Sequence, residues 1–135
     1  MKVLVDTSVW SLALRRKRQA TTPIVRELAE VVREGRVAMI GPIRQELLSG
    51  LKESQQFNLL REHLRAFPDL ALESADFEEA AQCFNRCRAM GIQGSNTDFL
   101  ICAVAVRRHW SIFTTDGDFP AYGRALALHL HQPRS

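Results

Sequence analysis

Short apolar runs alternate with longer amphipathic segments along the whole chain. A strand that is apolar at consecutive positions, without alternation, is buried on both faces, which is typical of a parallel sheet covered by helices. The pattern therefore predicts five strands in one parallel sheet. They span residues 2–5, 37–40, 70–72, 111–115 and 125–130.

The segments between these runs have the spacing of helices. Apolar residues recur on one face of the second segment, at Ile24, Leu28, Val31 and Val32, and the last segment is apolar on nearly all sides, so it is expected to be a buried helix. The helices are predicted at residues 8–16, 23–35, 41–50, 54–67, 74–91 and 97–109.

The predicted helix at 74–91 carries two further expectations. Its first residue, Ser74, is a favoured N-cap residue. Its apolar positions predict an inward face made of Phe77, Ala80, Ala81 and Phe84.

The order of strands and helices indicates an α/β fold, in which a parallel sheet lies between two layers of helices. The length of 135 residues and an apolar content of 46% fit a single domain, residues 1–135, with a substantial core. The chain has no apolar run long enough to span a membrane and no signal-peptide pattern at its start. A cytoplasmic protein with no membrane association is expected.

The cysteines do not have the spacing of a metal or disulfide framework. Cys83 and Cys87 are one helical turn apart, Cys102 stands alone, and the histidines are scattered. A zinc site or a disulfide is therefore disfavoured, and the three thiols are expected to be small buried apolar groups.

The charge of the chain is mildly basic, with a net charge of +3 and a pI near 9.1. That value permits nucleic-acid binding without requiring it. Basic residues are dense in two places, a group at 107–109 and a run formed by Arg15, Arg16, Lys17 and Arg18. Each group is explained either as a solvated helix end or as a surface that attracts a phosphate backbone.

Acidic residues follow two of the predicted strands and begin two of the predicted helices. Asp6 follows the strand at 2–5, and Asp116 follows the strand at 111–115. Glu46 lies near the start of one helix, and Asp98 lies in the first turn of the buried helix. Singly, Asp6 and Asp98 are explained as helix caps and Glu46 as an exposed helical residue. Together, all four map to the edge where sites form in a parallel sheet.

Four carboxylates at one edge of a sheet repel one another unless a cation lies between them. Hard divalent cations take oxygen ligands, and no cysteine or histidine is expected nearby, so Mg²⁺ or Mn²⁺ is favoured over zinc. Asp118 is explained equally well as a further ligand or as the cap of a short helix. Ser8 is explained as a helix cap or as a partner that hydrogen-bonds a ligand carboxylate.

A carboxylate-bound Mg²⁺ suits the hydrolysis of a phosphodiester chain. The ion lowers the pKa of bound water and neutralises charge on phosphoryl oxygens. Basic residues around the pocket would attract the substrate backbone over a distance.

Four motifs of this chain resemble those of the PIN-domain family, and the length resembles the VapC-type toxins of bacterial toxin–antitoxin pairs. The motifs are "VLVDTSVW", "ELLSG", "TDFLICAVA" and "FTTDGDF", and their order is matched over essentially the whole chain. The resemblance implies a Mg²⁺-dependent ribonuclease with a five-stranded parallel sheet. It also implies an antitoxin partner whose C-terminal segment covers the active site, and a homodimer.

The same resemblance assigns roles to individual residues. It implies an acid quartet of Asp6, Glu46, Asp98 and Asp116, with Asp6 and Asp98 as the firmest metal ligands. Asp118 matches a position that is often acidic. Asn96 and Thr115 match commonly polar positions next to the acids. Together with Ser8, they are predicted as residues that support the metal ligands.

Other functions remain alternatives. A phosphatase or phosphotransferase with an aspartyl-phosphate intermediate typically has a second acid two residues after the strand-end aspartate, and Ser8 stands there instead. A receiver domain needs an aspartate ending its third strand and a lysine ending its last, and the chain has neither. A housekeeping RNA-processing nuclease and an inert PIN-like binding module also remain open; the complete quartet argues against the inert module.

Overall fold

The structure is a computed structural model that describes residues 1–14 and 22–134. The basic run at Arg15, Arg16, Lys17 and Arg18 lies outside the described residues. The helices and strands, in chain order, are β1 (Val3–Val5), α1 (Thr7–Leu14), α2 (Pro23–Arg33), β2 (Val37–Ala38), α3 (Gly41–Leu48), α4 (Ser54–Leu64), α5 (Ser74–Ala89), α6 (Asn96–Arg108), β3 (Ser111–Phe113) and α7 (Asp118–Tyr122).

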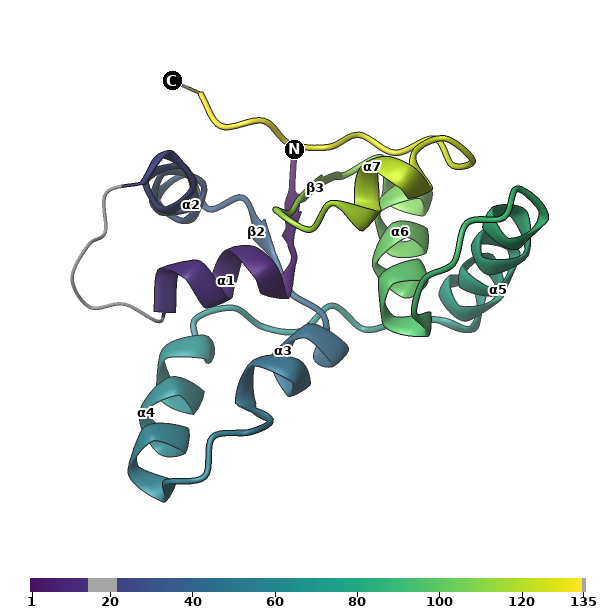
Figure 1. Cartoon of the computed structure of the whole chain (residues 1–135). Coiled ribbons are helices and arrows are strands. Elements are labelled where there is room, and N and C mark those ends of the chain that lie inside the picture. Colours follow the sequence, from purple (N-terminus) through teal and green to yellow (C-terminus); the bar gives the residue numbers. More distant parts are fainter. Residues whose placement is uncertain (15–21, 135) are drawn as a thin grey trace.

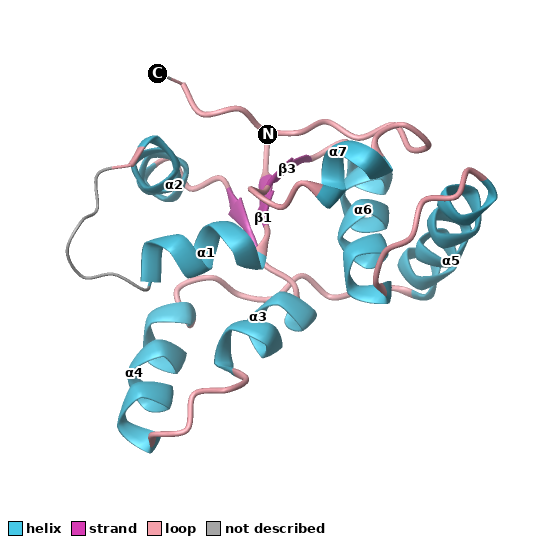
Figure 2. Ribbon diagram, viewed as in Figure 1, coloured by secondary structure: helices cyan, strands magenta, loops and turns pink. Residues whose placement is uncertain are grey.

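A small parallel sheet occupies the centre of the molecule, and helices surround it (Figures 1 and 2). Its strands run in the order β2–β1–β3, with Leu4 opposite Ala38 on one side and Ile112 on the other. Figure 1 shows α1 and α2 to one side of the sheet and α5, α6 and α7 to the other, while α3 and α4 extend below. The α/β class with helices on both sides of a parallel sheet is confirmed.

The prediction of five strands is wrong, because the described residues form three. The segments predicted as the other two strands lie at the sheet's edges. One parallel bridge, between Met39 and Asp69, falls just before the predicted strand at 70–72, and another, between Ile112 and Leu130, falls at the end of the predicted strand at 125–130. At the second edge, the N–H of Leu128 donates to the carbonyl of Leu126, and this tight turn interrupts the extended backbone. A segment at the edge of a sheet can pair with a strand on one side only. A short edge segment therefore forms few hydrogen bonds with the sheet before its backbone turns away.

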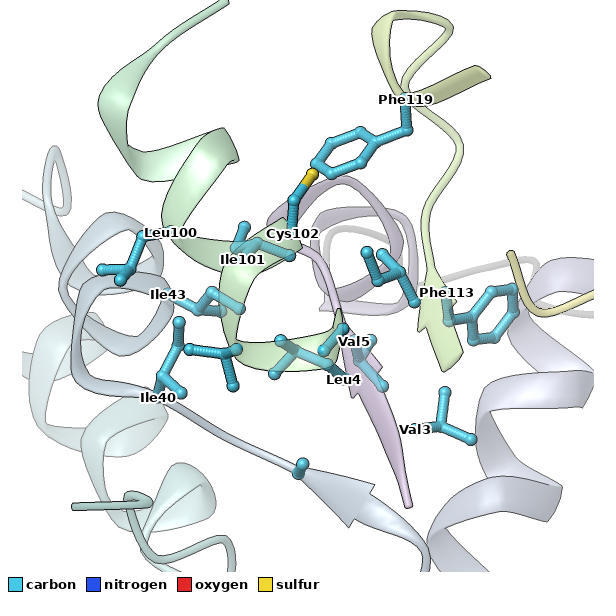
Figure 3. Close-up of a cluster of buried hydrophobic side chains, with 14 of the residues drawn as sticks. Val3, Leu4, Val5, Ile40, Ile43, Leu100, Ile101, Cys102, Phe113 and Phe119 are labelled. Carbon is cyan, nitrogen blue, oxygen red and sulfur yellow. The ribbon is translucent and has the colours of Figure 1, made fainter. Parts of the chain in front are cut away.

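The buried centre of the fold follows the non-alternating apolar pattern. All three residues of β1 are fully buried, and α6 is buried continuously from Phe99 to Ala105. Figure 3 shows these side chains meeting those of α3, β3 and α7, with Phe119 pointing toward Cys102. The prediction of a buried helix at 97–109 is confirmed.

The predicted inward face of helix α5 is correct in part. Ala80 and Phe84 pack against the core, whereas Phe77 is 53% exposed and Ala81 is exposed. The fully buried positions of the helix include Asp76, which accepts hydrogen bonds from the guanidinium groups of Arg107 (2.6 Å) and Arg108 (2.7 Å) on α6. Burying this carboxylate without partners would be costly, so the ion pairs allow Asp76 to lie on the inner side of the helix.

Two other differences from the sequence predictions also involve Asp76. Ser74 is not the cap of α5, because the cap is Glu73, which forms a capping box with Asp76. Arg107 and Arg108 are engaged by Asp76, so they stabilise the fold at this end of α6 rather than serving only as solvated charges.

Helix α2 buries an acid that the sequence pattern placed outside its apolar face. Glu27 is 2% exposed, whereas Val32, predicted to face inward, is 38% exposed. Glu27 bonds His131 (2.6 Å) and the guanidinium of Arg134 (3.1 Å), which ties the C-terminal tail to α2. Burial opposes the ionised form of Glu27, but the bonds from Arg134 and His131 outweigh it and lower its pKa.

The three cysteines are free and buried, as expected. Burial raises the pKa of the Cys83 thiol to about 11, which keeps it protonated and unreactive at neutral pH. Within residues 1–14 and 22–134, no helix has the length and apolar character needed to cross a membrane.

Candidate metal centre

Asp6 lies between the last residue of β1, Val5, and the first residue of α1, Thr7. Its backbone N–H donates to the carbonyl of Phe113 (2.9 Å), and its own carbonyl accepts from the N–H of Val9 (3.1 Å). Its carboxylate also accepts a long bond from the N–H of Ser8 (3.4 Å), as a helix cap does. Asp6 is 5% exposed, so its carboxylate is held at the carboxyl edge of the sheet with little freedom to move.

Two hydroxyl groups orient the Asp6 carboxylate. Ser8 Oγ and Thr114 Oγ1 each donate to Asp6 Oδ2 at 2.8 Å. Each hydroxyl oxygen in turn accepts a backbone N–H at 3.0 Å, from Thr115 and Asp116 respectively. The two hydroxyl oxygens also lie 3.2 Å from each other, so Ser8, Thr114 and Asp6 form one hydrogen-bonded group.

Three further carboxylates converge next to this group. One oxygen from each of Asp98, Asp116 and Asp118 lies within 4.8 Å of the other two. Asp98 is in the first turn of α6, Asp116 follows β3, and Asp118 begins α7. Elements distant in sequence thus bring three acids to the same edge of the sheet as Asp6.

The electrostatics of Asp98 reflect this crowding. Burial raises its pKa, and the negative charges of Asp6 and Asp116 raise it further. A hydrogen bond from the hydroxyl of Tyr122 to Asp98 Oδ2 (2.6 Å) acts in the opposite direction. The net effect is a raised pKa, so the ionised carboxylate is held here at an energetic cost.

Hydrogen bonds fix the orientation of three of the acids. Asp6 accepts through Oδ2, Asp98 through Oδ2, and Asp116 through Oδ1, which accepts from the N–H of Asp118 (2.9 Å). These bonds limit how far the carboxylates can turn away from one another.

Glu46 occupies a different position from the other acids. It lies on α3, its side chain is exposed, and Oε1 accepts from the hydroxyl of Thr7 (2.7 Å). It is not one of the three acids whose oxygens lie within 4.8 Å of one another, but its partner Thr7 directly follows Asp6 in the chain. Arg44 does not neutralise it, since that guanidinium bonds Asp69 (2.9 Å) and the carbonyl of Leu64 (3.0 Å).

The residues predicted to support the metal ligands make different contacts in the structure. Ser8 bonds the Asp6 carboxylate directly, whereas Thr115 has an exposed side chain and contributes its backbone N–H. Asn96 is exposed at the start of α6. Sequence reasoning did not single out Thr114 or Tyr122. The paired threonines of "TTDGDF" and the one tyrosine of the chain, four residues after Asp118, were the available signals.

The donor set of the site suits a hard divalent cation. It consists of carboxylate oxygens, which Mg²⁺, Mn²⁺ and Ca²⁺ prefer, and it contains no nitrogen or sulfur. In the described part of the chain, no cluster with a histidine or cysteine has comparable ligand geometry. The carboxylates also repel one another, and a bound cation would offset that repulsion.

A second surface feature is an apolar groove between α1, α3 and α4. Its volume is about 910 Å³, and Leu59, at its border, is 62% exposed. The residues that line it include Leu14, Leu47, Leu51, Leu59, Leu60 and His63. Ser11 and Gln56 also line the groove, so it is largely but not wholly apolar, and exposed apolar patches often mark interaction sites.

Comparison with known proteins places these features in a family. Residues 3–125 match the PIN domain. Over 128 residues, the chain is 32% identical to VapC ribonuclease Mb1587 of Mycobacterium bovis, covering 93% of this chain and 95% of the relative. It has the same identity and coverage with ribonuclease VapC11 of Mycobacterium tuberculosis.

Solved structures share the fold at lower sequence identity. FitAcB from Neisseria gonorrhoeae superposes with a TM-score of 0.76 at 23% identity, covering 97% of each chain. VapBC2 from Rickettsia felis, bound to a DNA fragment from its promoter, gives a TM-score of 0.78 at 16% identity, covering 97% of this chain and 98% of the other.

Proposed function

This chain belongs to the PIN-domain family, and we propose that it is a metal-dependent endoribonuclease that hydrolyses phosphodiester bonds of RNA. Its curated relatives are named VapC ribonucleases over nearly the full length of both chains, which supports the reaction class. The observation that carries the proposal is the convergence of Asp98, Asp116 and Asp118 beside Asp6.

The residues that would hold the cation are Asp98, Asp116, Asp6 and Asp118. A divalent ion bound there supplies a water of lowered pKa and positive charge near the phosphoryl oxygens. We propose Mg²⁺ as the physiological ion and Mn²⁺ as a substitute, because both take all-oxygen ligands.

The other residues of the site prepare it for this role. Ser8 and Thr114 fix the orientation of Asp6 through their hydroxyls. Glu46 is exposed, so its carboxylate is available to hold a water or accept a proton from it at the solvent side of the site. We assign Glu46 to this position, at the margin of the group of three acids.

The test is cleavage of single-stranded RNA by the purified protein. Cleavage is expected with Mg²⁺ or Mn²⁺, none in EDTA, and none for Asp6→Asn or Asp98→Asn. Asp69→Asn is the matched control, because Asp69 pairs with Arg44 away from the site. Absence of cleavage by wild-type protein with either ion would contradict the proposal, as would full activity of both site variants.

We further propose that the chain is the toxin of a type II toxin–antitoxin pair. The similar structures include VapBC2, VapBC-1 and a toxin–antitoxin complex from Klebsiella pneumoniae, which supports a partner protein. The groove between α1, α3 and α4 is the surface we assign to that antitoxin, because it is apolar and open. Growth arrest on expression, relieved by a cognate partner, separates a toxin from a housekeeping RNA-processing nuclease.

Two other features belong to the same proposal. A homodimer is expected, which light scattering of the purified protein tests. The RNA substrate would be met in the cytoplasm, where the sequence predicts the protein to reside.

A further inference from the structure

Tyr122 contributes to the acidic site from inside the core. It is fully buried, and its hydroxyl donates to Asp98 Oδ2 at 2.6 Å. An ionised carboxylate accepts hydrogen bonds but cannot donate them, so the hydroxyl must be the donor. Because the ring is buried, the hydroxyl cannot exchange this bond for one to bulk water.

The ring of Tyr122 is held between two other aromatic rings. Its centroid lies 4.9 Å from that of Phe99 and 5.1 Å from that of Phe119. Phe99 follows Asp98 in the chain, and Phe119 follows Asp118. The three rings therefore link the start of α6 to the start of α7, and with it the backbone that carries two acids of the site.

Gly94 provides the space that Tyr122 occupies. A Cβ atom at residue 94 would lie 2.5 Å from the Tyr122 hydroxyl oxygen and 2.7 Å from two of its ring carbons. These distances are too short for any side chain unless the ring moves. The backbone of Gly94 is not in the left-handed region, unlike that of Gly35, Gly50 and Gly91, so the ring, and not the backbone, requires glycine here.

We propose that Tyr122 is a positioning residue for the metal site, seated by Gly94, whose hydroxyl binds Oδ2 of Asp98 and so fixes the orientation in which this carboxylate meets the cation. This inference rests on the proposed function, because it concerns the same site. It assigns a role to a residue outside the acid quartet.

A purely structural role for Tyr122 makes a different prediction. If the ring only fills the core, then Tyr122→Phe keeps the contacts with Phe99 and Phe119, and metal binding is unchanged. If the hydroxyl positions Asp98, the same variant weakens metal binding on the order of tenfold, as loss of an outer hydrogen bond to a metal ligand typically does.

Two glycine variants provide a matched comparison. Gly94→Ala retains the tyrosine but pushes its hydroxyl away from Asp98, so it is expected to weaken metal binding as Tyr122→Phe does. Gly41→Ala is the control, because a Cβ there meets nothing within 4 Å. Metal affinity is measured as Mn²⁺ binding by electron paramagnetic resonance, and RNA cleavage is followed at several Mn²⁺ concentrations.

A measurement on the unaltered protein keeps the proposal testable if either variant fails to fold. Tyr122 is the one tyrosine of the chain, so ¹³Cζ-tyrosine labelling gives a single resonance. Addition of Mg²⁺ is expected to shift this resonance, because charge at Asp98 changes when the cation binds. A resonance that stays fixed at Mg²⁺ concentrations that raise the melting temperature would overturn the proposal.

The outcomes distinguish this inference from the proposed function. Wild-type protein that binds no Mn²⁺ and cleaves no RNA contradicts the proposed function, and the role of Tyr122 falls with it. Wild-type protein that binds Mn²⁺, with Tyr122→Phe binding equally well, contradicts the role of Tyr122 alone. Weaker binding by Tyr122→Phe and Gly94→Ala, with Gly41→Ala unchanged, supports both.

Discussion

The hydroxyl of Thr114 donates a 2.8 Å hydrogen bond to Asp6 Oδ2, joining residues that are 108 positions apart in the chain. The same hydroxyl oxygen accepts the N–H of Asp116 at 3.0 Å. Thr114 therefore connects the end of β1 to the segment after β3, and it links two acids of the site through one side chain.

Replacement of Thr114 by valine tests this connection. The change keeps the size of the side chain but leaves Asp6 with one hydroxyl donor fewer and the Asp116 N–H without its acceptor. Stability is expected to fall by about 1–3 kcal/mol, and cleavage to fall on the order of tenfold. Urea unfolding and RNA cleavage measure the two effects.

Thr115→Val is the matched control for that experiment. Its side chain is exposed, and its contact with Ser8 uses the backbone N–H, which valine retains. Stability is expected to change by less than about 0.5 kcal/mol. Equal losses in the two variants would contradict the role given to Thr114.

Replacement of Asp98 by asparagine is expected to stabilise the protein when metal is absent. Burial and the charges of Asp6 and Asp116 raise the pKa of Asp98, so its ionised form weakens the folded state once pH exceeds the ordinary range of a carboxyl group, near 4. Asparagine removes the charge and keeps an oxygen for the Tyr122 hydroxyl. The melting temperature in EDTA should rise by about 4 °C at pH 8, and the rise should become smaller as pH is lowered toward the unfolded-state pKa.

Addition of Mg²⁺ should reverse the order of the two proteins. A ligand that binds the folded state raises the melting temperature, so wild type gains and Asp98→Asn gains little. A lower melting temperature for Asp98→Asn in EDTA would show that the carboxylates do not repel one another appreciably.

Asp76 is expected to govern stability in acid. The guanidinium of Arg108 holds the pKa of Asp76 well below its usual range despite burial, with further bonds from the Glu73 backbone and Arg107. The resulting stabilisation is present above the unfolded-state pKa, near 3.9, and is lost as pH falls through the lower folded-state pKa. Asp76→Asn should therefore cost about 3 kcal/mol at pH 7 and less at pH 3, measured by urea unfolding.

A surface acid provides the comparison for Asp76. Glu62 pairs with Arg65, and its side chain is 56% exposed. Glu62→Gln should cost less than about 1 kcal/mol at either pH. A loss for Asp76→Asn that does not depend on pH would show that packing, and not charge, is its main contribution.

The apolar groove is expected to bind the partner protein. Leu59→Glu places a charge at its border, where the side chain is already 62% exposed, so the isolated protein should keep its stability. Affinity for the cognate antitoxin should fall by at least about tenfold in calorimetric titration, because binding would bury that charge without a partner. Phe77→Glu, on α5 and 53% exposed, is the control. An equal effect of both substitutions would assign the partner to another surface.

The sequence could predict the strands' location and the edge where the acids gather, because both follow from local patterns. Non-alternating apolar runs identify buried strands, and an acid directly after such a strand lies at its carboxyl edge. Asp6 and Asp116 are of this kind. The pattern could not predict where the edge segments leave the sheet, because pairing there depends on a neighbour that lies far away in the chain.

The sequence also could not predict which side chains bond one another in the folded protein. The burial of Asp76 on α5 depends on its ion pairs with Arg107 and Arg108, and no property of residues 74–91 alone predicts these pairs. Asp118 and Glu46 show the same limit within the site: the former lies among the converging carboxylates and the latter at their margin. Their placement is set by the turn after β3 and by α3, whose geometry the sequence spacing does not determine.

The contact between Gly94 and Tyr122 restricts how this protein can diverge. Any relative that acquires a side chain at position 94 has to shrink or shift the aromatic ring at 122, because one volume cannot hold both. The two positions should thus change as a pair over evolutionary time, and a lineage that loses the phenol should be free to lose the glycine.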